Sequence, residues 1–176
     1  GPRTIPFDYR GNLEPIKPGQ LIYIDDGNLI LRVKATSANS IKAIVVEGGI
    51  LKERKGINIP GVDLEFDGIT AKDRKDIAFA IENEVDYVAL SFVRDENDVR
   101  QVAGLIKSEL PHCRIVAKIE SRRAIRNIDE IIAAADGIMI ARGDMGVAVP
   151  IHQVPIIQKQ IIRKSNAAGK FVITAT

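Results

Sequence analysis

Three charged side chains in the last third of the chain have the types and spacing to bind a metal and a small anion together. Lys118 and Glu120 end one apolar run, residues 114–120, and Asp144 ends a second, residues 137–144. Short apolar runs predict buried strands, and α/β proteins commonly place charged functional groups where such strands stop. We therefore interpret Lys118, Glu120 and Asp144 as the centre of one candidate site.

The two carboxylates and the lysine predict complementary roles. Glu120 and Asp144 offer hard oxygen ligands, and Mg²⁺ typically takes one or two protein carboxylates and completes its shell with water and substrate oxygens. Lys118 lies two residues before Glu120 on the expected strand, so both side chains leave the same face. Its ammonium would face negative charge that develops on a substrate. A purely structural ion pair is the alternative, although paired burial seldom improves on apolar packing.

Residues 142–146 predict a second part of the site. Gly143 and Gly146 let the backbone approach a ligand closely, and a turn into a short helix would aim N–H groups at a carboxylate or phosphate. Thr176 stands at the end of another expected strand, where its hydroxyl can donate to the same ligand. These residues therefore add anion-binding groups to the carboxylates.

Strands and helices alternate over the second part of the chain, and this order brings the charged residues together. The sequence predicts helices that begin near Thr70 and Asp95. The other expected elements are strands over 87–93, 115–120, 137–141 and 171–176 and helices over 128–135 and 155–168. Strands joined by helices are parallel, and right-handed crossovers bring their C-terminal ends to one edge. Glu120, Asp144 and Thr176 are therefore expected at one edge of a sheet.

The same element order fits a closed barrel or an open doubly wound sheet. The chain has neither of the glycine-rich phosphate-binding sequences that announce most open nucleotide-binding sheets. A closed barrel needs about eight β/α units in roughly 250 residues, and this chain supplies about four. We predict an α/β fold in which residues 62–176 form the central part of a TIM (β/α)₈ barrel with parallel strands.

Residues 1–61 have the texture of a small all-β module. Two β-rich runs, 21–24 and 29–33, flank an Asp-Gly turn, which is a strong hairpin signal. A second hairpin is expected to turn at 37–40 and to continue into a strand over 41–46. The glycine- and proline-containing stretch 56–61 then predicts a domain boundary.

Composition excludes several classes of protein. The 25 basic and 23 acidic residues nearly cancel, so no global field favours nucleic acid or an anionic membrane. The single Cys113 excludes an internal disulfide framework, and His112 and His152 have no acidic partner at metal spacing. No apolar stretch approaches the ~20 residues of a membrane span. We expect a cytoplasmic protein with no nucleic-acid or membrane partner.

Several of these motifs, in this order, resemble the pyruvate kinase family. The motifs occupy residues 24–27, 55–61, 91–94, 115–120, 136–146 and 169–176. The family fold is a (β/α)₈ barrel with a small β domain, the lid, inserted after the third strand, and a separate C-terminal domain. The resemblance implies that residues 1–61 are part of the lid domain and that residues 62–176 are central barrel units.

The resemblance implies a glycolytic phosphotransferase that moves phosphate from phosphoenolpyruvate to ADP, giving pyruvate and ATP. In such an enzyme Glu120 and Asp144 hold Mg²⁺, or Mn²⁺, and Lys118 stabilises the charge of phosphoryl transfer and of the enolate. The backbone amides of Gly143 and Asp144, together with Thr176, hold the substrate carboxylate. Lys55 reaches ADP or ATP. These roles agree with phosphoryl transfer as positioning plus electrostatics.

The match to the family pattern is incomplete. Arg123 stands where the family usually has an acidic or polar residue, and Ala148 stands where a glutamate is common. The resemblance implies K⁺ dependence and a homotetramer, but the N-terminal strands that bear the K⁺ ligands and the phosphate-gripping arginine have no counterpart here. We therefore expect the 176 residues alone to be inactive.

Two other functions remain open at this stage. One is a Mg²⁺-dependent aldolase or lyase that acts on pyruvate-like enolates, which would lack the β module and give Lys55 no role. The other is a non-catalytic half-barrel that only packs against a partner chain, in which Glu120 and Asp144 would bind no metal.

Overall fold

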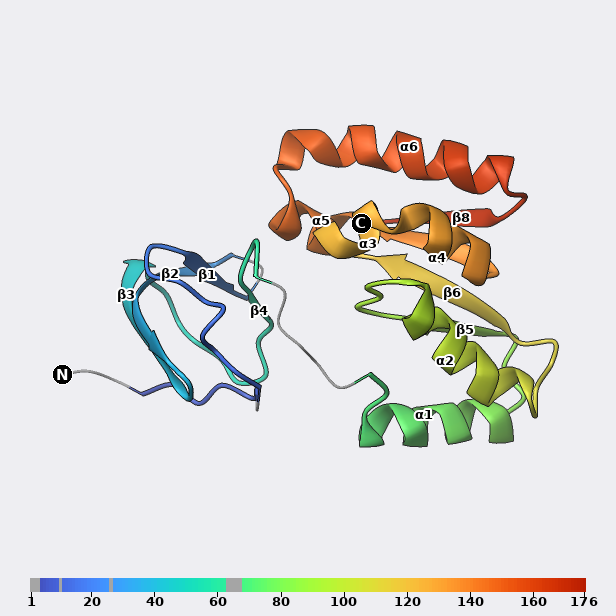
Figure 1. Cartoon of the computed structure of the whole chain (residues 1–176), viewed down its shortest axis with the longest axis horizontal. Helices are drawn as coiled ribbons and strands as arrows, with labels where there is room; N and C mark the ends of the chain where they lie inside the picture. The colour runs from blue at the N-terminus through green and yellow to red at the C-terminus, as the bar shows by residue number, and fades with distance from the viewer. Residues whose placement is uncertain (1–3, 10, 26, 63–67) are drawn as a thin grey trace. The chain divides into compact units, whose positions relative to one another are not determined.

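The structure of the chain is a computed structural model that describes residues 4–9, 11–25, 27–62 and 68–176. The chain divides into two compact units, residues 1–66 and 67–176, which Figure 1 shows in blue to green and in green to red. The sequence places the boundary at 61/62, five residues earlier. Residues 63–67, which adjoin or precede the second position, lie outside the described residues.

The N-terminal unit is an antiparallel sheet of four strands in the order β3-β2-β1-β4. The strands are β1 (Leu21–Ile24), β2 (Leu29–Ser37), β3 (Ser40–Glu47) and β4 (Ile57–Asn58). Ile24 pairs with Leu29, and Ser37 pairs with Ser40, so both predicted hairpins are confirmed. Seven buried apolar residues form the core of this unit: Leu13, Ile16, Ile22, Ile24, Leu29, Val33 and Ile59.

The second unit is a parallel sheet of four strands in the order β5-β6-β7-β8, as the alternating pattern predicts. The strands are β5 (Tyr87–Leu90), β6 (Arg114–Ile119), β7 (Gly137–Ala141) and β8 (Phe171–Ala175). The helices are α1 (Ala71–Glu82), α2 (Glu96–Lys107), α3 (Arg122–Arg126), α4 (Ile128–Ala134), α5 (Arg142–Ala148) and α6 (Val154–Ala167), with a 3₁₀ turn η1 (Ile151–Gln153). The fold is therefore α/β in the second unit, which is part of a barrel, and the N-terminal unit is a small β sheet.

Local sequence explains where most of these helices begin and end. Thr70 and Asp73 form a reciprocal capping box at the start of α1, and the Asp95 side chain caps α2 by accepting from Asn97 N–H. Gly169 follows α6 with φ +67°, a conformation that ends a helix at little cost for glycine. Among the described residues, no helix is long and apolar enough to cross a membrane.

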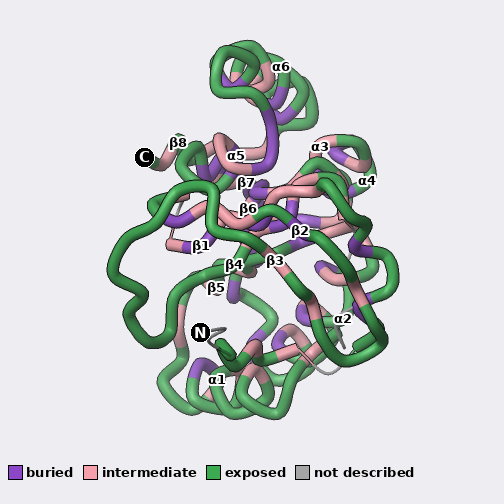
Figure 2. Tube along the Cα trace, turned by 90° about the vertical axis from the view of Figure 1, so that its left-hand side faces the viewer, coloured by how far each residue is buried: buried purple, intermediate pink, exposed green. Residues whose placement is uncertain are grey.

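The two central strands of the parallel sheet are the most deeply buried. Most residues of β6 and β7 are buried, because helices cover the sheet, and Figure 2 colours buried residues purple. The outer strands β5 and β8 are the edges of the described sheet, and their residues are half-buried or exposed. The edge residues Tyr87 and Ile173 are 56% and 41% exposed. The two central strands of the described sheet are therefore buried, and the two edge strands are partly exposed.

The start of β7 has no room for a side chain. A Cβ on Gly137 would collide with the ring of Phe171, which packs edge-on against Tyr87 with 5.9 Å between ring centroids. We expect Gly137→Ala to lower the free energy of unfolding by about 1–3 kcal/mol, because the Phe171 ring must move away from its contact. Urea denaturation followed by circular dichroism measures this loss.

A glycine in α2 provides the matched control. Nothing lies within 4 Å of a Cβ on Gly104, so Gly104→Ala is expected to stabilise the protein by about 0.5–1 kcal/mol through helix propensity. Combining Gly137→Ala with Phe171→Leu is expected to recover part of the loss. Equal unfolding free energies for Gly137→Ala and the parent protein would contradict the close approach of Phe171.

Candidate active site

The candidate residues follow three adjacent strands of the parallel sheet. Glu120 directly follows β6, α5 begins directly after β7, and Thr176 directly follows β8. Ile119 pairs with Ile140, and Ala141 pairs with Ala175, so the three strand ends lie side by side. Figure 1 shows α5 and the C-terminus at this edge. The predicted convergence of strand ends is therefore present in the fold.

The half-buried Lys118 and the buried Glu120 form an ion pair at the end of β6. Lys118 Nζ lies 2.7 Å from Glu120 Oε1, and the two side chains are 24% and 4% exposed. Lys118 Nζ also donates to Ser91 Oγ at 2.8 Å. Glu120 Oε2 accepts from the backbone N–H of Phe92 at 3.0 Å. A carboxylate oxygen can accept about two hydrogen bonds, so each oxygen of Glu120 keeps a lone pair for a cation.

The loop after β5 supplies two contacts to the ion pair, from Ser91 and Phe92, that were not predicted from the sequence. The sequence predicts a strand over 87–93, but β5 ends at Leu90. Phe92 adopts φ +56°, which breaks the extended backbone and turns its N–H toward Glu120. The Ser91–Arg94 motif was the available signal, but it carried no role for Ser91 or Phe92. These two residues complete the surroundings of the ion pair.

Asp144 lies in the first turn of α5, where it is exposed. Its carboxylate has no hydrogen-bond or ion-pair partner among the described residues. An unpartnered carboxylate at the same edge of the sheet as the buried Glu120 carboxylate would suit a hard cation such as Mg²⁺. The described residues contain no group of three or more His, Cys, Asp and Glu side chains that could hold a metal. A cation bound by Glu120 and Asp144 would therefore take its other ligands from water and substrate.

Gly143 makes the close backbone approach that its residue type predicts, but to another part of the chain. Its N–H donates to the carbonyl oxygen of Thr176 at 2.9 Å, and a Cβ would lie 3.2 Å from that oxygen. Arg142 Nε donates to the Ala175 carbonyl at 2.8 Å, which ties α5 to the end of β8 a second time. The Gly143 amide can hold a substrate carboxylate only if its bond to Thr176 is exchanged.

Lys55 belongs to the N-terminal unit and is held by the first hairpin. Its Nζ lies 2.7 Å from Asp25 Oδ1, and Asp25 sits in the turn with φ +55°. The hydrogen bond from Lys55 holds the pKa of Asp25 below its ordinary value. Lys118 and Glu120 are thus in direct contact, Gly143, Asp144 and Thr176 share their edge of the sheet, and Lys55 lies in the other unit.

Arg123 and Ala148, the two positions that depart from the family pattern, contact residues of neighbouring segments. Arg123 Nη2 lies 2.8 Å from Asp95 Oδ2, so the arginine has an acidic partner in the preceding loop. Ala148 is buried at the end of α5, and its carbonyl accepts from Arg122 Nε at 2.6 Å. The Arg123 side chain is thus paired with an acidic residue, whereas the contact at position 148 involves only the backbone.

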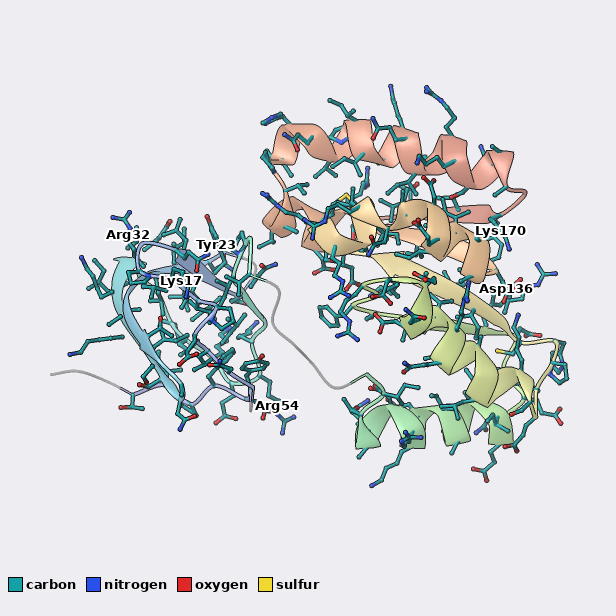
Figure 3. All side chains as sticks on the ribbon, in the orientation of Figure 1. Lys17, Tyr23, Arg32, Arg54, Asp136 and Lys170 are labelled. Carbon is teal, nitrogen blue, oxygen red and sulfur yellow. The ribbon has the colours of Figure 1, made fainter. Side chains whose placement is uncertain are left out.

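Two other aspartates, outside the set of candidate site residues, also form ion pairs. Asp98 pairs with Arg94, and Asp136 accepts from Lys107 and from the Ile115 N–H. Asp136 directly precedes β7 and Lys170, also labelled in Figure 3, directly precedes β8, so both lie where strands begin, whereas Glu120 follows the end of β6. Burial opposes ionisation of both aspartates, but the hydrogen bonds outweigh it, and the pKa of each carboxyl lies below its ordinary value.

These lowered pKa values predict loss of stability in acid. Because the unfolded chain binds protons more readily at Asp98 and Asp136, their contribution is complete above about pH 4 and is lost as the pH falls through the lower folded pKa values. Urea midpoints measured between pH 2 and pH 6 should show the slope. Asp136→Asn is expected to flatten it, and an unchanged slope would contradict the assignment.

Comparisons with known proteins agree with the fold. A family model described as the pyruvate kinase barrel domain matches residues 2–176. The chain is 49% identical to a pyruvate kinase from Clostridium perfringens, over 97% of this chain and 36% of the relative. It is 46% identical to one from Geobacillus stearothermophilus, over 99% of this chain and 30% of the relative. For one from Thermococcus litoralis the values are 47%, 98% and 36%.

The chain spans about a third of the length of these relatives, with shares of 30% to 36%. The family model covers nearly the whole chain, and the parallel sheet with its helices is the architecture expected of part of that family's barrel. The chain belongs to the pyruvate kinase family.

Proposed function

We propose that the full-length protein to which this chain belongs transfers phosphate from phosphoenolpyruvate to ADP to give pyruvate and ATP. Activity, and every kinetic effect of a substitution, is expected of that protein, because the 176 residues alone are expected to be inactive. The observation that carries this proposal is the Lys118–Glu120 pair, with 2.7 Å between Nζ and Oε1, at the C-terminal end of a parallel strand. Phosphoryl transfer is catalysed mainly by positioning and by electrostatic stabilisation, and a fixed ammonium beside a cation-binding carboxylate supplies both. Membership of the pyruvate kinase family supports the same reaction.

Glu120 and Asp144 are the residues that would hold Mg²⁺ or Mn²⁺. A bound cation supplies Lewis-acid polarisation of the phosphoryl and enolate oxygens. Glu120 is fixed by the Phe92 N–H and by Lys118, whereas the exposed Asp144 carboxylate is open to solvent. Glu120 would therefore anchor the cation, and Asp144 would close its coordination when substrate arrives.

Lys118 is the catalytic residue of this proposal. Ser91 Oγ and Glu120 Oε1 hold its ammonium at 2.8 Å and 2.7 Å, which limits its movement before the reaction. A positive charge that is already in place stabilises the enolate and the transferring phosphoryl group without reorganisation. The Gly143 and Asp144 amides and the Thr176 hydroxyl would orient the substrate carboxylate, once the Gly143 amide leaves the Thr176 carbonyl.

Substitution of Lys55 distinguishes the proposed phosphate transfer from the reaction of a Mg²⁺-dependent lyase. In the proposed reaction Lys55 contacts the nucleotide, so Lys55→Ala should raise the KM for ADP by about 10- to 100-fold, the worth of a charge-assisted hydrogen bond. The KM for phosphoenolpyruvate should stay the same. A coupled assay of pyruvate formation measures both constants.

Lys52→Ala is the matched control, because Lys52 is an exposed lysine three residues before Lys55. It is expected to leave both KM values unchanged. Turnover of phosphoenolpyruvate without ADP, combined with a silent Lys55→Ala variant, would favour a Mg²⁺-dependent lyase that acts on pyruvate-like enolates.

The proposal extends to K⁺ activation and to a homotetramer, which the family resemblance implies. The test for K⁺ is a comparison of activity in potassium and sodium salts of equal ionic strength. Light scattering measures the assembly state. Equal activity in the two salts, or a monomeric mass, would remove that part of the proposal.

A further inference from the structure

The loop after β5 holds a residue whose backbone conformation needs outside support. Phe92 has φ +56°, in the left-handed region that bulky side chains rarely adopt. Its ring is 78% exposed, so packing of the ring does not stabilise this conformation. Strained residues of this kind persist where their surroundings determine the conformation, and they cluster at functional sites. Here the conformation presents the Phe92 N–H to the buried Glu120 carboxylate at 3.0 Å.

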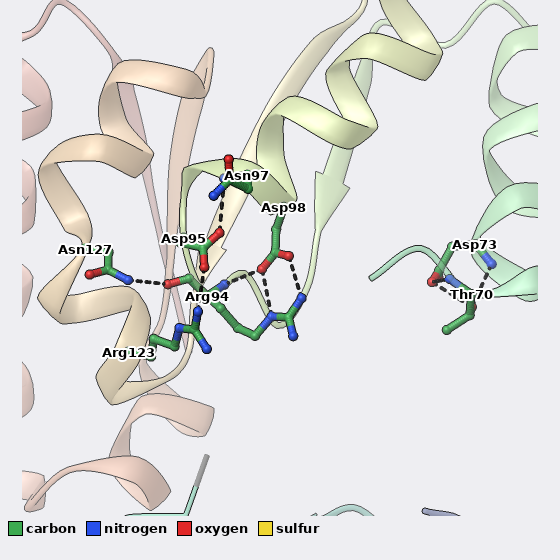
Figure 4. A network of polar contacts seen from close by, with 8 residues as sticks. All are labelled: Thr70, Asp73, Arg94, Asp95, Asn97, Asp98, Arg123 and Asn127. Carbon is green, nitrogen blue, oxygen red and sulfur yellow. Dashed lines mark hydrogen bonds and ion pairs between the residues drawn. The ribbon is translucent and has the colours of Figure 1, made fainter. Parts of the chain in front are cut away.

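The residues that follow Phe92 make several polar contacts, which Figure 4 shows. The backbone N–H and the guanidinium of Arg94 donate to the Asp98 carboxylate at 2.7–3.0 Å. Asn127 Nδ2 donates to the Arg94 carbonyl at 3.0 Å. Arg123 Nη2 donates to Asp95 Oδ2 at 2.8 Å. The loop therefore contacts Asp98 of the following helix, α2, and also two residues, Arg123 and Asn127, that follow β6.

The outside contacts come from the segment that follows Glu120. Arg123 lies in α3, and Asn127 is the residue between α3 and α4, so both belong to the chain immediately after the candidate cation ligand. Asp95 divides its two oxygens, because Oδ1 accepts from Asn97 N–H as the cap of α2 while Oδ2 accepts from Arg123. The β5 and β6 ends are thus joined by the Phe92–Glu120 hydrogen bond and, separately, by the Asp95–Arg123 pair.

We propose that the Asp95–Arg123 ion pair is a clamp that positions Glu120 for cation binding. The pair holds residues 91–95 in the conformation that keeps the Phe92 N–H on Glu120 Oε2, which fixes the carboxylate. Asp95 and Arg123 are positioning residues, since they act through Phe92 and touch neither cation nor substrate. The inference rests on the proposed function, which assigns Glu120 to the cation. It also gives a role to Arg123, which departs from the usual family pattern.

The test separates the ion pair from the helix cap. Asp95→Asn removes the charge but keeps a good capping residue, and Arg123→Gln removes the other charge. Each variant is expected to raise the dissociation constant of Mn²⁺, measured by electron paramagnetic resonance, by about tenfold, as outer partners of metal ligands commonly do. The double variant should lose no more than either single variant. Arg123→Lys, which keeps the charge, should retain most of the affinity.

A second measurement follows the clamp without any metal. In ¹⁵N-phenylalanine-labelled protein, hydrogen exchange of the Phe92 amide should be faster in Asp95→Asn and Arg123→Gln, because its bond to Glu120 is loosened. Exchange in peptides from the buried strand β7 reports whether the fold is intact. The matched control is Lys164→Gln, which breaks the exposed Lys164–Asp129 pair between α6 and α4 and should change neither reading.

The outcomes distinguish this inference from the proposed function. Unchanged Phe92 exchange in Arg123→Gln would overturn the clamp, whatever Glu120 binds. Faster exchange with an unchanged Mn²⁺ dissociation constant would also overturn it, because the pair would then be structural only. If Glu120→Gln leaves Mn²⁺ binding unchanged, Glu120 is not the metal ligand, and the proposed function fails together with the role of the clamp in cation binding. Exchange of the Phe92 amide would still show whether the Asp95–Arg123 pair holds the Phe92–Glu120 hydrogen bond.

Discussion

Replacing Glu120 by Gln is expected to lower kcat on the order of 10³-fold and to abolish stabilisation by divalent cations. Glutamine has nearly the same shape and can still accept from the Phe92 N–H, so the local fold should survive. It cannot supply the negative charge that balances Lys118 and would bind a cation. The coupled pyruvate assay measures kcat, and melting temperatures with and without Mg²⁺ measure the stabilisation.

The control for this variant is Glu130→Gln, because Glu130 is an exposed glutamate of α4 on the same unit. It should change neither kcat nor the effect of Mg²⁺ on melting. Mg²⁺-dependent stabilisation that survives in both Glu120→Gln and Asp144→Asn would argue that the unit is a non-catalytic half-barrel that packs against a partner.

Lys118→Met should lower kcat by about 10²- to 10³-fold while the KM for phosphoenolpyruvate changes little. The ammonium is expected to interact more strongly with the charge of the transition state than with bound substrate. The same substitution leaves the Glu120 carboxylate, which is 4% exposed, without its counter-ion. The free energy of unfolding should therefore also fall by about 1–3 kcal/mol.

A double substitution separates these two effects of Lys118. Lys118→Met combined with Glu120→Gln leaves no unpaired charge, so it should recover most of the stability and none of the activity. Lys107→Met is the control, because it removes a lysine from an ion pair with Asp136, at the opposite end of the strands. Near-normal kcat in Lys118→Met would contradict the catalytic assignment and favour a purely structural pair.

The sequence was sufficient to predict the parallel sheet and the shared face of Lys118 and Glu120. Alternation along a strand places side chains two residues apart on the same face, and these two are in contact in the structure. The first hairpin of the N-terminal unit was also predictable, because an Asp-Gly turn between β-rich runs specifies the pairing locally. In each case the decisive information lay within a few residues of the element.

The end of β5 and helix α3 were not predicted, for different reasons. Phe92 has a high strand propensity, and its left-handed conformation depends on contacts with residues 28 positions away, which a local pattern does not contain. Helix α3 has a local signal, because Ser121 caps it by accepting from Ala124 N–H. Its five residues are too few to produce a helical period in the sequence.

The open sides of the parallel sheet have a consequence for how this unit behaves in solution. Strands β5 and β8 are the edges of the described sheet and present main-chain N–H and C=O groups beside partly exposed apolar residues, among them Tyr87 and Ile173. Such edges recruit further strands, whether from the same polypeptide or from another copy. A unit with these exposed edge strands is expected to self-associate as its concentration rises. Further barrel strands that paired with β5 and β8 would occupy the same hydrogen-bonding groups and so reduce this aggregation.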